Sequence, residues 1–398
     1  MSAPPQSAIG EHVDSVSSWT PERDDPDGVF TYVDLSAVVQ DAKVVSGARE
    51  LACAEAPSRA RQLIRAGDVI VSTVRPNLNG VALVPPELDG ATASTGFCVL
   101  RPRPSQLDAR YLYQWVKSPR FVSEMVRKAT GASYPAVSDR IVRESKLPLP
   151  PLPEQRRIAE ILDKADALRA KRRVALAQLD TLTQSIFLDM FGDPATNPKG
   201  WPEESRLGDV ADVVSGVTIG RKLDGKQTRK VAYLAVVNVQ DRRLNLDTVK
   251  TTEATAEEVE RYRLEQNDLL LTEGGDPDKL GRGTLWDGSI PECIHQNHVF
   301  RVRVHDVRLT PQFLNWLVGS ERGKRYFLRS AKQTTGIASI NMTQLRAFPL
   351  LTPPLALQIE FGNRMDQVRQ IRNGLAAATA ECDSLYASLQ HSAFHGEL

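Results

Sequence analysis

Residues 147–162 read LPLPPLPEQRRIAEIL, and residues 348–365 read FPLLTPPLALQIEFGNRM. Each stretch places a proline cluster directly before a long proline-free segment that is rich in helix-forming residues. Proline ends regular structure but is tolerated in the first turn of a helix. Each stretch therefore predicts a domain boundary that is followed by a helix, and the chain divides into two globular parts with one helix after each.

Further matches between the two parts indicate a tandem repeat. They occur in the same order along both halves, at separations of about 200 residues, which is the signature of an internal duplication. The matched segments are Ile9-Gly10-Glu11 with Leu207-Gly208-Asp209, Tyr32-Val33 with Tyr233-Leu234, Gly67–Ser72 with Asn267–Thr272, Thr130-Gly131 with Thr335-Gly336, and Leu147-Pro148-Leu149 with Phe348-Pro349-Leu350. We therefore expect two similar globular heads related by a pseudo-two-fold repeat.

Both helical segments carry an apolar stripe with alternating spacings of three and four residues, the a/d pattern of a coiled coil. Such a stripe is ordinarily one face of an amphipathic helix. Here both stripes persist for more than four heptads, and each position of the second stripe lies 203 residues after its counterpart in the first. We therefore expect the two helices to form one intramolecular coiled coil. The stripes are Ile158, Ile161, Ala165, Leu168, Arg172, Ala175, Leu179, Leu182 and Ile186, and Phe361, Arg364, Val368, Ile371, Leu375, Ala378, Cys382, Leu385 and Leu389.

Glycine and proline between the helices give the remaining boundary, at Phe191-Gly192-Asp193-Pro194. The predicted domains are a first head at 1–150, a helix at 151–195, a second head at 196–350 and a helix at 351–398. Both heads show short β-branched runs, such as 68–74 and 299–304, and helical stretches at 109–128 and 311–330. The predicted fold class is α+β, with helix and strand mixed in each head.

The composition is that of a globular protein with balanced charge. The chain has 398 residues, with 50 Lys and Arg against 49 Asp and Glu, so the net charge does not by itself indicate nucleic-acid binding. The four cysteines lack CxxC spacing, which argues against a disulfide framework and a structural zinc site. No apolar run approaches the length of a membrane span, and the first residues do not resemble a secretion signal, so we expect a cytoplasmic protein without membrane contact.

Familiar catalytic signatures are missing from the sequence. Gly319–Lys324 is one residue short of a phosphate-binding loop, and no glycine-rich nucleotide motif or methyltransferase tetrapeptide is found. Cys293, His295, His298 and His305 could suggest a metal site, but His295 and His298 would lie on opposite faces of a strand. We expect a non-catalytic chain that binds no metal.

Nucleic acid could instead be bound by loops in which basic and amide side chains collect. Arg, Asn and Gln can contact base edges, whereas Lys, Ser and Thr suit phosphates. Solvated surface loops would have the same composition. The candidate residues are Arg75, Asn77, Asn79, Arg127, Lys128, Ser133 and Tyr134 in the first head, and Lys279, Arg282, Gln296, Asn297, Lys332, Thr334 and Thr335 in the second.

The segment from Leu147 to Leu162, with its Pro-Glu-Gln start, resembles the spacer helix of specificity (S) subunits of type I restriction-modification systems. The resemblance covers nearly the whole chain and implies two target recognition domains and two antiparallel helices. Each head would read one half of a bipartite site in double-stranded DNA. A helix over 154–190 would span about 55 Å, more than one turn of B-DNA. The second repeat departs from the pattern at Ala356-Leu357-Gln358.

The resemblance also implies partners: two methyltransferase (M) subunits and restriction (R) subunits. The methyl donor, ATP and Mg²⁺ would then belong to these partners, and this chain would bind no cofactor. The main alternative is a coiled-coil adaptor or structural protein whose heads bind proteins. A second alternative is a stand-alone nuclease or methyltransferase with an unrecognised site.

Overall fold

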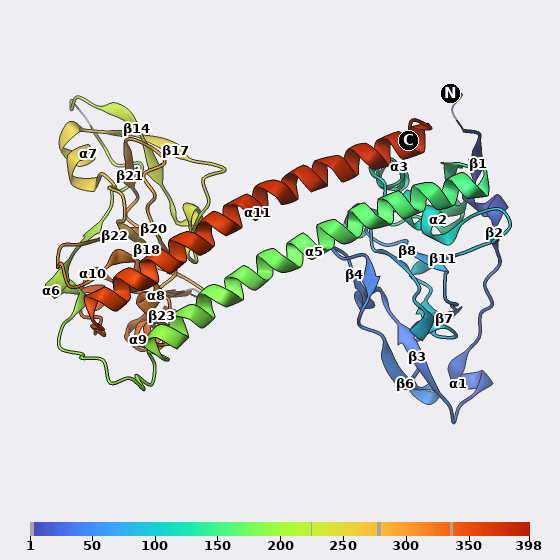
Figure 1. Ribbon diagram of the computed structural model, residues 1–398, viewed down its shortest axis with the longest axis horizontal. Helices are drawn as coiled ribbons and strands as arrows, with labels where there is room; N and C mark the ends of the chain where they lie inside the picture. The colour runs from blue at the N-terminus through green and yellow to red at the C-terminus, as the bar shows by residue number, and fades with distance from the viewer. Residues whose placement is uncertain (1–3, 224, 277–279, 335–336) are drawn as a thin grey trace. The chain divides into compact units, whose positions relative to one another are not determined.

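The computed structural model describes residues 4–223, 225–276, 280–334 and 337–398. The chain forms two compact units, one of Met1–Leu176 with Gly374–Leu398 and the other of Ala177–Asn373. Two long helices, α5 (Leu152–Phe191) and α11 (Leu355–His395), each contribute residues to both units (Figure 1). Each unit thus combines one head with part of each long helix. No helix in the described part of the chain is long and apolar enough to cross a membrane.

The first head contains two four-stranded sheets. One has the order β6-β3-β10-β7, and the other has the order β2-β11-β8-β9. The strands of the first sheet are β6 (Arg49–Ala52), β3 (Val29–Val33), β10 (Thr92–Ser94) and β7 (Ala60–Leu63). Those of the second are β2 (Val13–Asp14), β11 (Phe97–Pro102), β8 (Val69–Ser72) and β9 (Val81–Leu83). Two short pairs complete the set: β1 (Gln6–Ala8) with β12 (Lys146–Pro148), and β4 (Val38–Val39) with β5 (Val44–Val45).

The α-helices in the described residues of this head are α1 (Pro21–Asp24), α2 (Ala109–Val116), α3 (Pro119–Lys128) and α4 (Asp139–Glu144). The stretch 109–128, expected to be helical, is thus two helices. The break occurs because Ser118 caps α3, where its Oγ accepts a hydrogen bond from Phe121 N, and because Pro119 occupies the first helical position.

The sequence of β8 is an unbroken apolar run because both faces of the strand are buried. Val69 and Val71 pack on one side with Tyr111 and Trp115 of α2, whereas Ile70 packs on the other side with Phe97. A strand that is covered on both faces has no need of polar alternation. Two hydrophobic clusters of the first unit therefore lie on opposite faces of this sheet.

The second head repeats this arrangement. Its main sheet has the order β13-β22-β18-β20, and a three-stranded sheet has the order β17-β14-β21. The main-sheet strands are β13 (Ala211–Ser215), β22 (Val299–Val304), β18 (Leu269–Thr272) and β20 (Gly283–Leu285). The others are β17 (Lys250–Ala254), β14 (Arg229–Leu234), β21 (Cys293–His295), β15 (Val239–Gln240), β16 (Arg243–Leu244), β19 (Gly274–Gly275), β23 (Lys332–Thr334) and β24 (Ile337–Ser339).

The helices of the second head are α6 (Leu207–Val210), α7 (Ala256–Tyr262), α8 (Pro311–Val318), α9 (Glu321–Ser330) and α10 (Met342–Arg346). The antiparallel pair β18–β22 corresponds to β8–β11, and the parallel pair β14–β21 corresponds to β3–β10. The predicted duplication of a mixed α and β head is confirmed.

The long helices pack antiparallel in each unit. In the first unit, Arg157 Nη2 lies 2.6 Å from Leu398 O and Arg169 Nε lies 2.5 Å from Asp383 Oδ1. In the second unit, the rings of Phe187 and Phe361 are 5.5 Å apart. Arg372 Nη1 also lies 3.3 Å from Asp180 Oδ1. Positions that advance along α5 meet positions that recede along α11, so the antiparallel pairing is confirmed.

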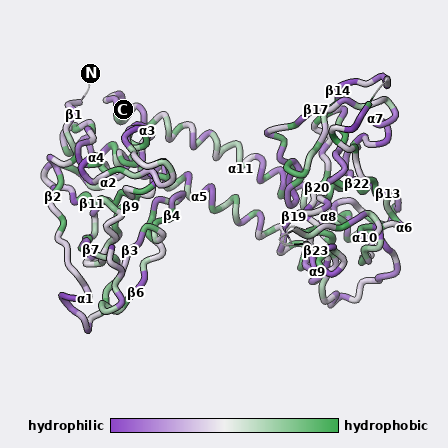
Figure 2. The backbone as a smooth tube through the Cα atoms, turned by 180° about the vertical axis from the view of Figure 1, so that it is seen from behind, coloured by the Kyte–Doolittle hydropathy of each residue, from purple (hydrophilic) through white to green (hydrophobic). Residues whose placement is uncertain are grey.

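The buried stripe differs from the expected seam at two apolar positions of each helix. Leu168, Leu182, Ile371 and Leu385 are 46%, 45%, 59% and 57% exposed. The residues that follow Leu168 and Leu385, Arg169 and Tyr386, face inward instead. The shift arises because each helix packs against a head as well as against the other helix, which centres the buried face one residue later. Along both helices, hydrophilic and hydrophobic residues alternate closely (Figure 2).

Of the other seam positions, Arg364 is exposed, and the apolar ones are at least half-buried. Ile158, Phe361 and Val368 are buried. Ile161, Ala165, Leu179, Ile186, Leu375 and Leu389 are half-buried.

Candidate nucleic-acid interface

Three segments of the first head meet at one end of the β8–β11 pair. Thr73 N, just after β8, donates to Gly96 O in the turn before β11. Two further hydrogen bonds join this segment to the loop after α3, which contains Pro135 and Val137. Val137 N donates to Thr73 O, and Arg75 N donates to Pro135 O. Distant parts of the sequence are thereby joined into one surface, which we call the first junction: residues 73–80, 95–96 and 129–137.

The first junction brings together several of the predicted residues. The Arg75 guanidinium carbon lies 5.0 Å from the centre of the Tyr134 ring, and both side chains are exposed. Asn77 and Ser133 are also exposed, and Asn79 is half-buried. Arg75 and Asn79 have positive φ angles of 51° and 47°, flanking the short 3-10 helix η4 (Pro76–Leu78). This backbone is costly for residues with a Cβ, so surrounding contacts must hold it.

The remaining first-head candidates lie at the end of α3, which packs against η4. Arg127 and Lys128 are exposed there. Lys128 Nζ is 2.6 Å from Glu124 Oε1 one turn earlier on the same helix. The positive charge of Lys128 is therefore partly balanced, whereas Arg127 adds to the positive charge beside the junction.

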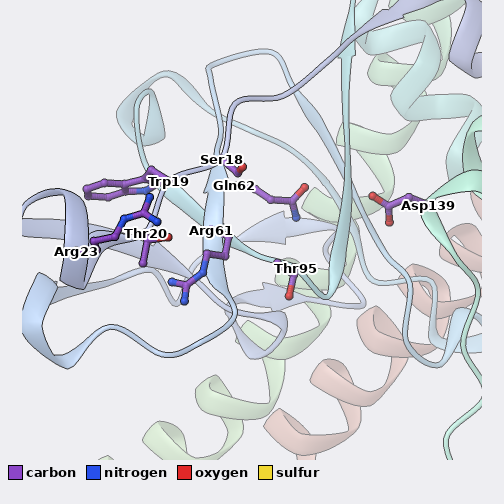
Figure 3. A pocket seen from close by; sticks show the side chains of 8 residues that line it. All are labelled: Ser18, Trp19, Thr20, Arg23, Arg61, Gln62, Thr95 and Asp139. Atoms are coloured by element: carbon purple, nitrogen blue, oxygen red, sulfur yellow. The ribbon is translucent and has the colours of Figure 1, made fainter.

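An open pocket of about 430 Å³ adjoins the first junction at the Thr95 turn (Figure 3). Its wall comes from α1 and the chain before it, from β7, from the Thr95 turn and from the start of α4. The lining residues are Ser18, Trp19, Thr20, Arg23, Arg61, Gln62, Thr95 and Asp139. None of them was a candidate from the sequence, because they come from four separate segments that only the fold brings together.

A lysine that sequence reasoning missed supports the 75–79 loop. Lys43 Nζ donates to Asn79 O at 2.6 Å and to Leu78 O at 3.4 Å. Tyr113 OH donates in turn to Lys43 O at 2.8 Å. Burial and the nearby Lys117 lower the pKa of Lys43, burial having the larger effect. A single lysine in a polar stretch gives no local signal of this role.

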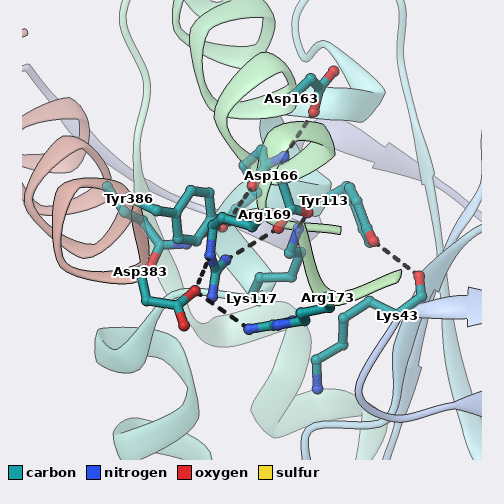
Figure 4. Close-up of polar contacts among 11 residues, drawn as sticks. Lys43, Tyr113, Lys117, Asp163, Asp166, Arg169, Arg173, Asp383 and Tyr386 are labelled. Carbon is teal, nitrogen blue, oxygen red and sulfur yellow. Dashed lines mark hydrogen bonds and ion pairs between the residues drawn. The ribbon is translucent and has the colours of Figure 1, made fainter. Parts of the chain in front are cut away.

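The support for the loop continues from Tyr113 to the long helices (Figure 4). Lys117 lies 4.6 Å from the centre of the Tyr113 ring and forms an ion pair with Asp166 of α5. Asp166 also pairs with Arg169 at 3.1 Å, and Arg169 lies over the Tyr386 ring of α11. Burial lowers the pKa of Lys117, although Asp166 opposes this shift. The polar chain thus connects the candidate loop to both helices within the first unit.

The second head has an equivalent junction. Glu273 N donates to His298 O and Ile340 N donates to Glu273 O, in the same pattern as Thr73, Gly96 and Val137. We call residues 273–276, 280–282, 296–298, 332–334 and 337–340 the second junction. It brings Gln296 and Asn297 to the same end of the β18–β22 pair as strands β23 and β24.

The remaining second-head candidates have different outcomes. Arg282 Nη1 donates to Gln240 Oε1 at 3.3 Å, and Lys332 is exposed. For Thr334 the structure describes only the backbone, in β23. Lys279 and Thr335 lie outside the described residues.

His298 and Glu273 form a pair on the second junction that sequence reasoning missed. His298 Nδ1 lies 2.5 Å from Glu273 Oε2. His295 is buried instead, and its Nδ1 lies 2.6 Å from Val299 O. Burial lowers the pKa of His295 to about 4. Within the described ranges, no three His, Cys, Asp or Glu side chains are grouped so that they could hold a metal ion.

Buried ion pairs fix the opposite end of each strand pair. Arg101 Nη2 lies 2.7 Å from Asp68 Oδ2 in the first head, and Arg303 Nη2 lies 2.8 Å from Asp268 Oδ2 in the second. Both aspartates are almost fully buried. Each junction is therefore carried on an antiparallel strand pair whose far end is held by a buried ion pair, as a surface that positions polar side chains requires.

Comparison with known proteins is consistent with this geometry. The sequence model of a family described as "Type I restriction modification DNA specificity domain" matches residues 62–178 and 198–379. The StySPI type I restriction enzyme specificity subunit of Salmonella potsdam is 23% identical over 323 residues, which are 76% of this chain and 68% of that protein.

Two solved structures are similar over almost the whole chain. One is described as "Structural basis underlying complex assembly and conformational transition of the type I R-M system"; it is 25% identical, covers 100% of both chains and has a TM-score of 0.65. The S subunit of a type I restriction-modification system from M. genitalium is 14% identical over 98% of this chain and 96% of that chain, with a TM-score of 0.55. The second likeness concerns the fold alone.

Proposed function

This chain belongs to the family of type I restriction modification DNA specificity domains, and on that premise we propose that it reads a bipartite site in double-stranded DNA. The observation that carries the proposal is the repeated junction. Each head joins three separate loops by the same pair of backbone hydrogen bonds, and each junction presents a different set of side chains. Equivalent frames with different surfaces suit two half-sites of different sequence.

The chemistry of the junction residues supports contact with DNA. Arg75 and Asn77 in the first head, and Gln296 and Asn297 in the second, can bond base edges. Arg127, Lys128 and Lys332 suit phosphates. We assign the same general role to the other candidates, which are Asn79, Ser133, Tyr134, Lys279, Arg282, Thr334 and Thr335. The near-neutral chain would then depend on this local collection of donors.

We further propose that residues 1–150 and 196–350 are the two target recognition domains, with spacer helices at 151–195 and 351–398. The helices would set the gap between half-sites. Leu168, Leu182, Ile371 and Leu385 leave apolar surface exposed on them. Exposed apolar surface of this kind commonly marks a protein interface, so we propose that two methyltransferase subunits dock there and that restriction subunits join the complex.

In this proposal the chain is a non-catalytic subunit of a cytoplasmic complex. The methyl donor, ATP and Mg²⁺ would be bound by the partner subunits. The similarity to type I specificity subunits over most of the chain favours this role over that of an adaptor whose heads bind proteins.

Selection from a pool of random-sequence DNA duplexes tests the proposal. We expect the purified chain, alone or with a methyltransferase subunit, to retain duplexes that share two short motifs at a constant separation. Binding should weaken steeply between about 50 and 200 mM salt, because phosphate contacts release counterions. Retention without a shared motif would contradict sequence-specific reading, and no retention at all would contradict the proposal and favour the adaptor.

A further inference from the structure

The first head contains a polar pocket that is lined by residues of β7. In the described part of the second head, the corresponding sheet has no strand equivalent to β7. In the first head, β7 extends the sheet next to β10, giving the order β6-β3-β10-β7. The corresponding sheet of the second head, β17-β14-β21, ends at β21. Arg61 and Gln62 of β7 line the pocket, so the pocket depends on this added strand.

Gln62 joins the pocket to the first junction. Its Nε2 donates to Ser94 O at 2.9 Å and to Phe97 O at 2.8 Å, on either side of the Thr95 turn. Thr95 N donates to Arg59 O just before β7, and Gly96 O accepts from Thr73 N of the junction. The pocket and the junction therefore share one turn, and a duplex lying on the junction would pass close to the pocket.

The pocket presents hydrogen-bond donors and acceptors together. Arg61 and the Thr95 hydroxyl can donate, while the Asp139 carboxylate can accept. The side-chain amide of Gln62 donates both of its hydrogens to backbone carbonyl oxygens. Its Oε1 is therefore left as an acceptor beside Arg61. Trp19 is held in the wall by a 2.9 Å hydrogen bond from Nε1 to Thr92 Oγ1. These groups line one opening (Figure 3).

The charge in and around the pocket favours a base edge over a phosphate. Arg23 is paired with Asp24 at 2.8 Å, and Arg61 Nη2 lies 3.8 Å from Glu22 Oε1. Asp139 adds a further negative charge on the opposite wall. Carboxylates around a phosphate would repel it, whereas a base edge offers both donors and acceptors.

We propose that this pocket is an additional DNA subsite of the first head, in which Arg61, Thr95 and Asp139 contact the edge of a base next to those read by the first junction. The inference rests on the proposed function. It predicts that the first half-site is read over more positions than the junction alone would specify, through a device that the corresponding sheet of the second head lacks.

The test compares motifs selected from random-sequence duplexes by the full chain and by its variants Arg61→Ala and Asp139→Asn. Each variant should lose the preference at one position of one half-site, with roughly a 10-fold or greater loss of discrimination there, as expected for a lost base contact. The other half-site should stay unchanged. Arg49→Ala, which removes an exposed arginine from β6 of the same head, is the matched control and should select the wild-type motif.

Each result has a distinct meaning. If the wild-type chain selects a two-part motif and both variants select the same motif, the subsite is disproved while the proposed function stands. If Arg61→Ala weakens binding equally for all sequences, the arginine contacts phosphate and the base-edge assignment is wrong. If the wild-type chain selects no motif, the proposed function fails and the subsite with it. Asp139→Asn keeps the test decisive should Arg61→Ala not fold.

Discussion

Gln155 and Gln358, which lie 203 positions apart, make the same three hydrogen bonds in their respective units. Gln155 Oε1 accepts from Asp108 N at 2.9 Å, and its Nε2 donates to Gln106 O and Pro150 O. Gln358 Oε1 accepts from Thr310 N at 2.9 Å, and its Nε2 donates to Arg308 O and Pro353 O. In each unit the glutamine ties the start of a long helix to the residues that begin a head helix.

Because both glutamines are buried, removing either side chain should be costly. We expect Gln155→Ala and Gln358→Ala each to lower the free energy of unfolding of their own unit by about 2–4 kcal/mol, since backbone groups lose buried partners. Urea unfolding followed by circular dichroism would measure this. Gln40→Ala and Gln370→Ala, at exposed positions of the first and second units, are the controls and should change it by less than about 0.5 kcal/mol. A loss no larger than that of the controls would show that these bonds do not hold the helices.

Arg169 and Asp383 offer a test of the shifted seam. Their atoms lie 2.5 Å apart, and Arg169 also covers Tyr386 at 4.2 Å from the ring centre. We expect a double-mutant cycle of Arg169→Met and Asp383→Asn to give a coupling energy of about 1 kcal/mol, because Arg169 is mostly buried and Asp383 is partly exposed. If Leu168 were the seam residue, Leu168→Ala would be the more damaging change. We expect instead that Arg169→Met lowers the midpoint temperature of thermal unfolding more than Leu168→Ala does.

His295 should make the second unit sensitive to acid. Burial holds its pKa at about 4 in the folded chain, below the ordinary value of 6.5. The folded state therefore favours the neutral ring, so the contribution to stability is complete above pH 6.5 and is lost as the pH falls from 6.5 toward 4. The full loss is roughly 3 kcal/mol. Urea unfolding across this range should show it, and His295→Gln should flatten the pH dependence. An equal pH dependence in the variant would assign the effect to other groups.

Lys43 should affect DNA binding through the loop that it supports. Lys43→Ala removes the donor to Leu78 O and Asn79 O, so the strained 75–79 backbone should loosen. We expect roughly a 10-fold weaker affinity for selected duplexes, equivalent to about 1.4 kcal/mol. The exposed Lys146→Ala removes the same charge from the first unit and serves as the control. Equal effects of the two variants would indicate charge alone.

The length of the helices should set the gap in the DNA motif. Deleting residues 170–176 together with 376–382 removes one heptad from each helix within the first unit and keeps the antiparallel pairing. The helices would shorten by about 10 Å, or roughly three base pairs. We expect selected duplexes to keep both half-site sequences and to lose about that many base pairs between them. An unchanged gap with intact binding would exclude the spacer role.

Much of the architecture could be predicted because its signals are local. The proline clusters, the apolar periodicity and the constant displacement of 203 are properties of neighbouring residues, and they predicted two heads and two paired helices. The candidate loops were also found locally, since Arg75 and Gln296 lie in polar stretches just after or before strands. Whether these side chains bind DNA remains a prediction.

What the sequence by itself determined was the repeat, the class of each head and the existence of the helix pair, because periodicity specifies local structure without knowledge of distant contacts. Only the tertiary structure decided which helix face is buried. Leu168 matches the heptad pattern, yet Arg169 turns inward. It does so because it contacts Asp383 and the ring of Tyr386, which lie on a helix more than two hundred residues later in the chain. The same holds for Lys43 under the 75–79 loop and for the pocket on β7. Each joins residues that are far apart in the chain, and their partners are determined by packing, which no local pattern records.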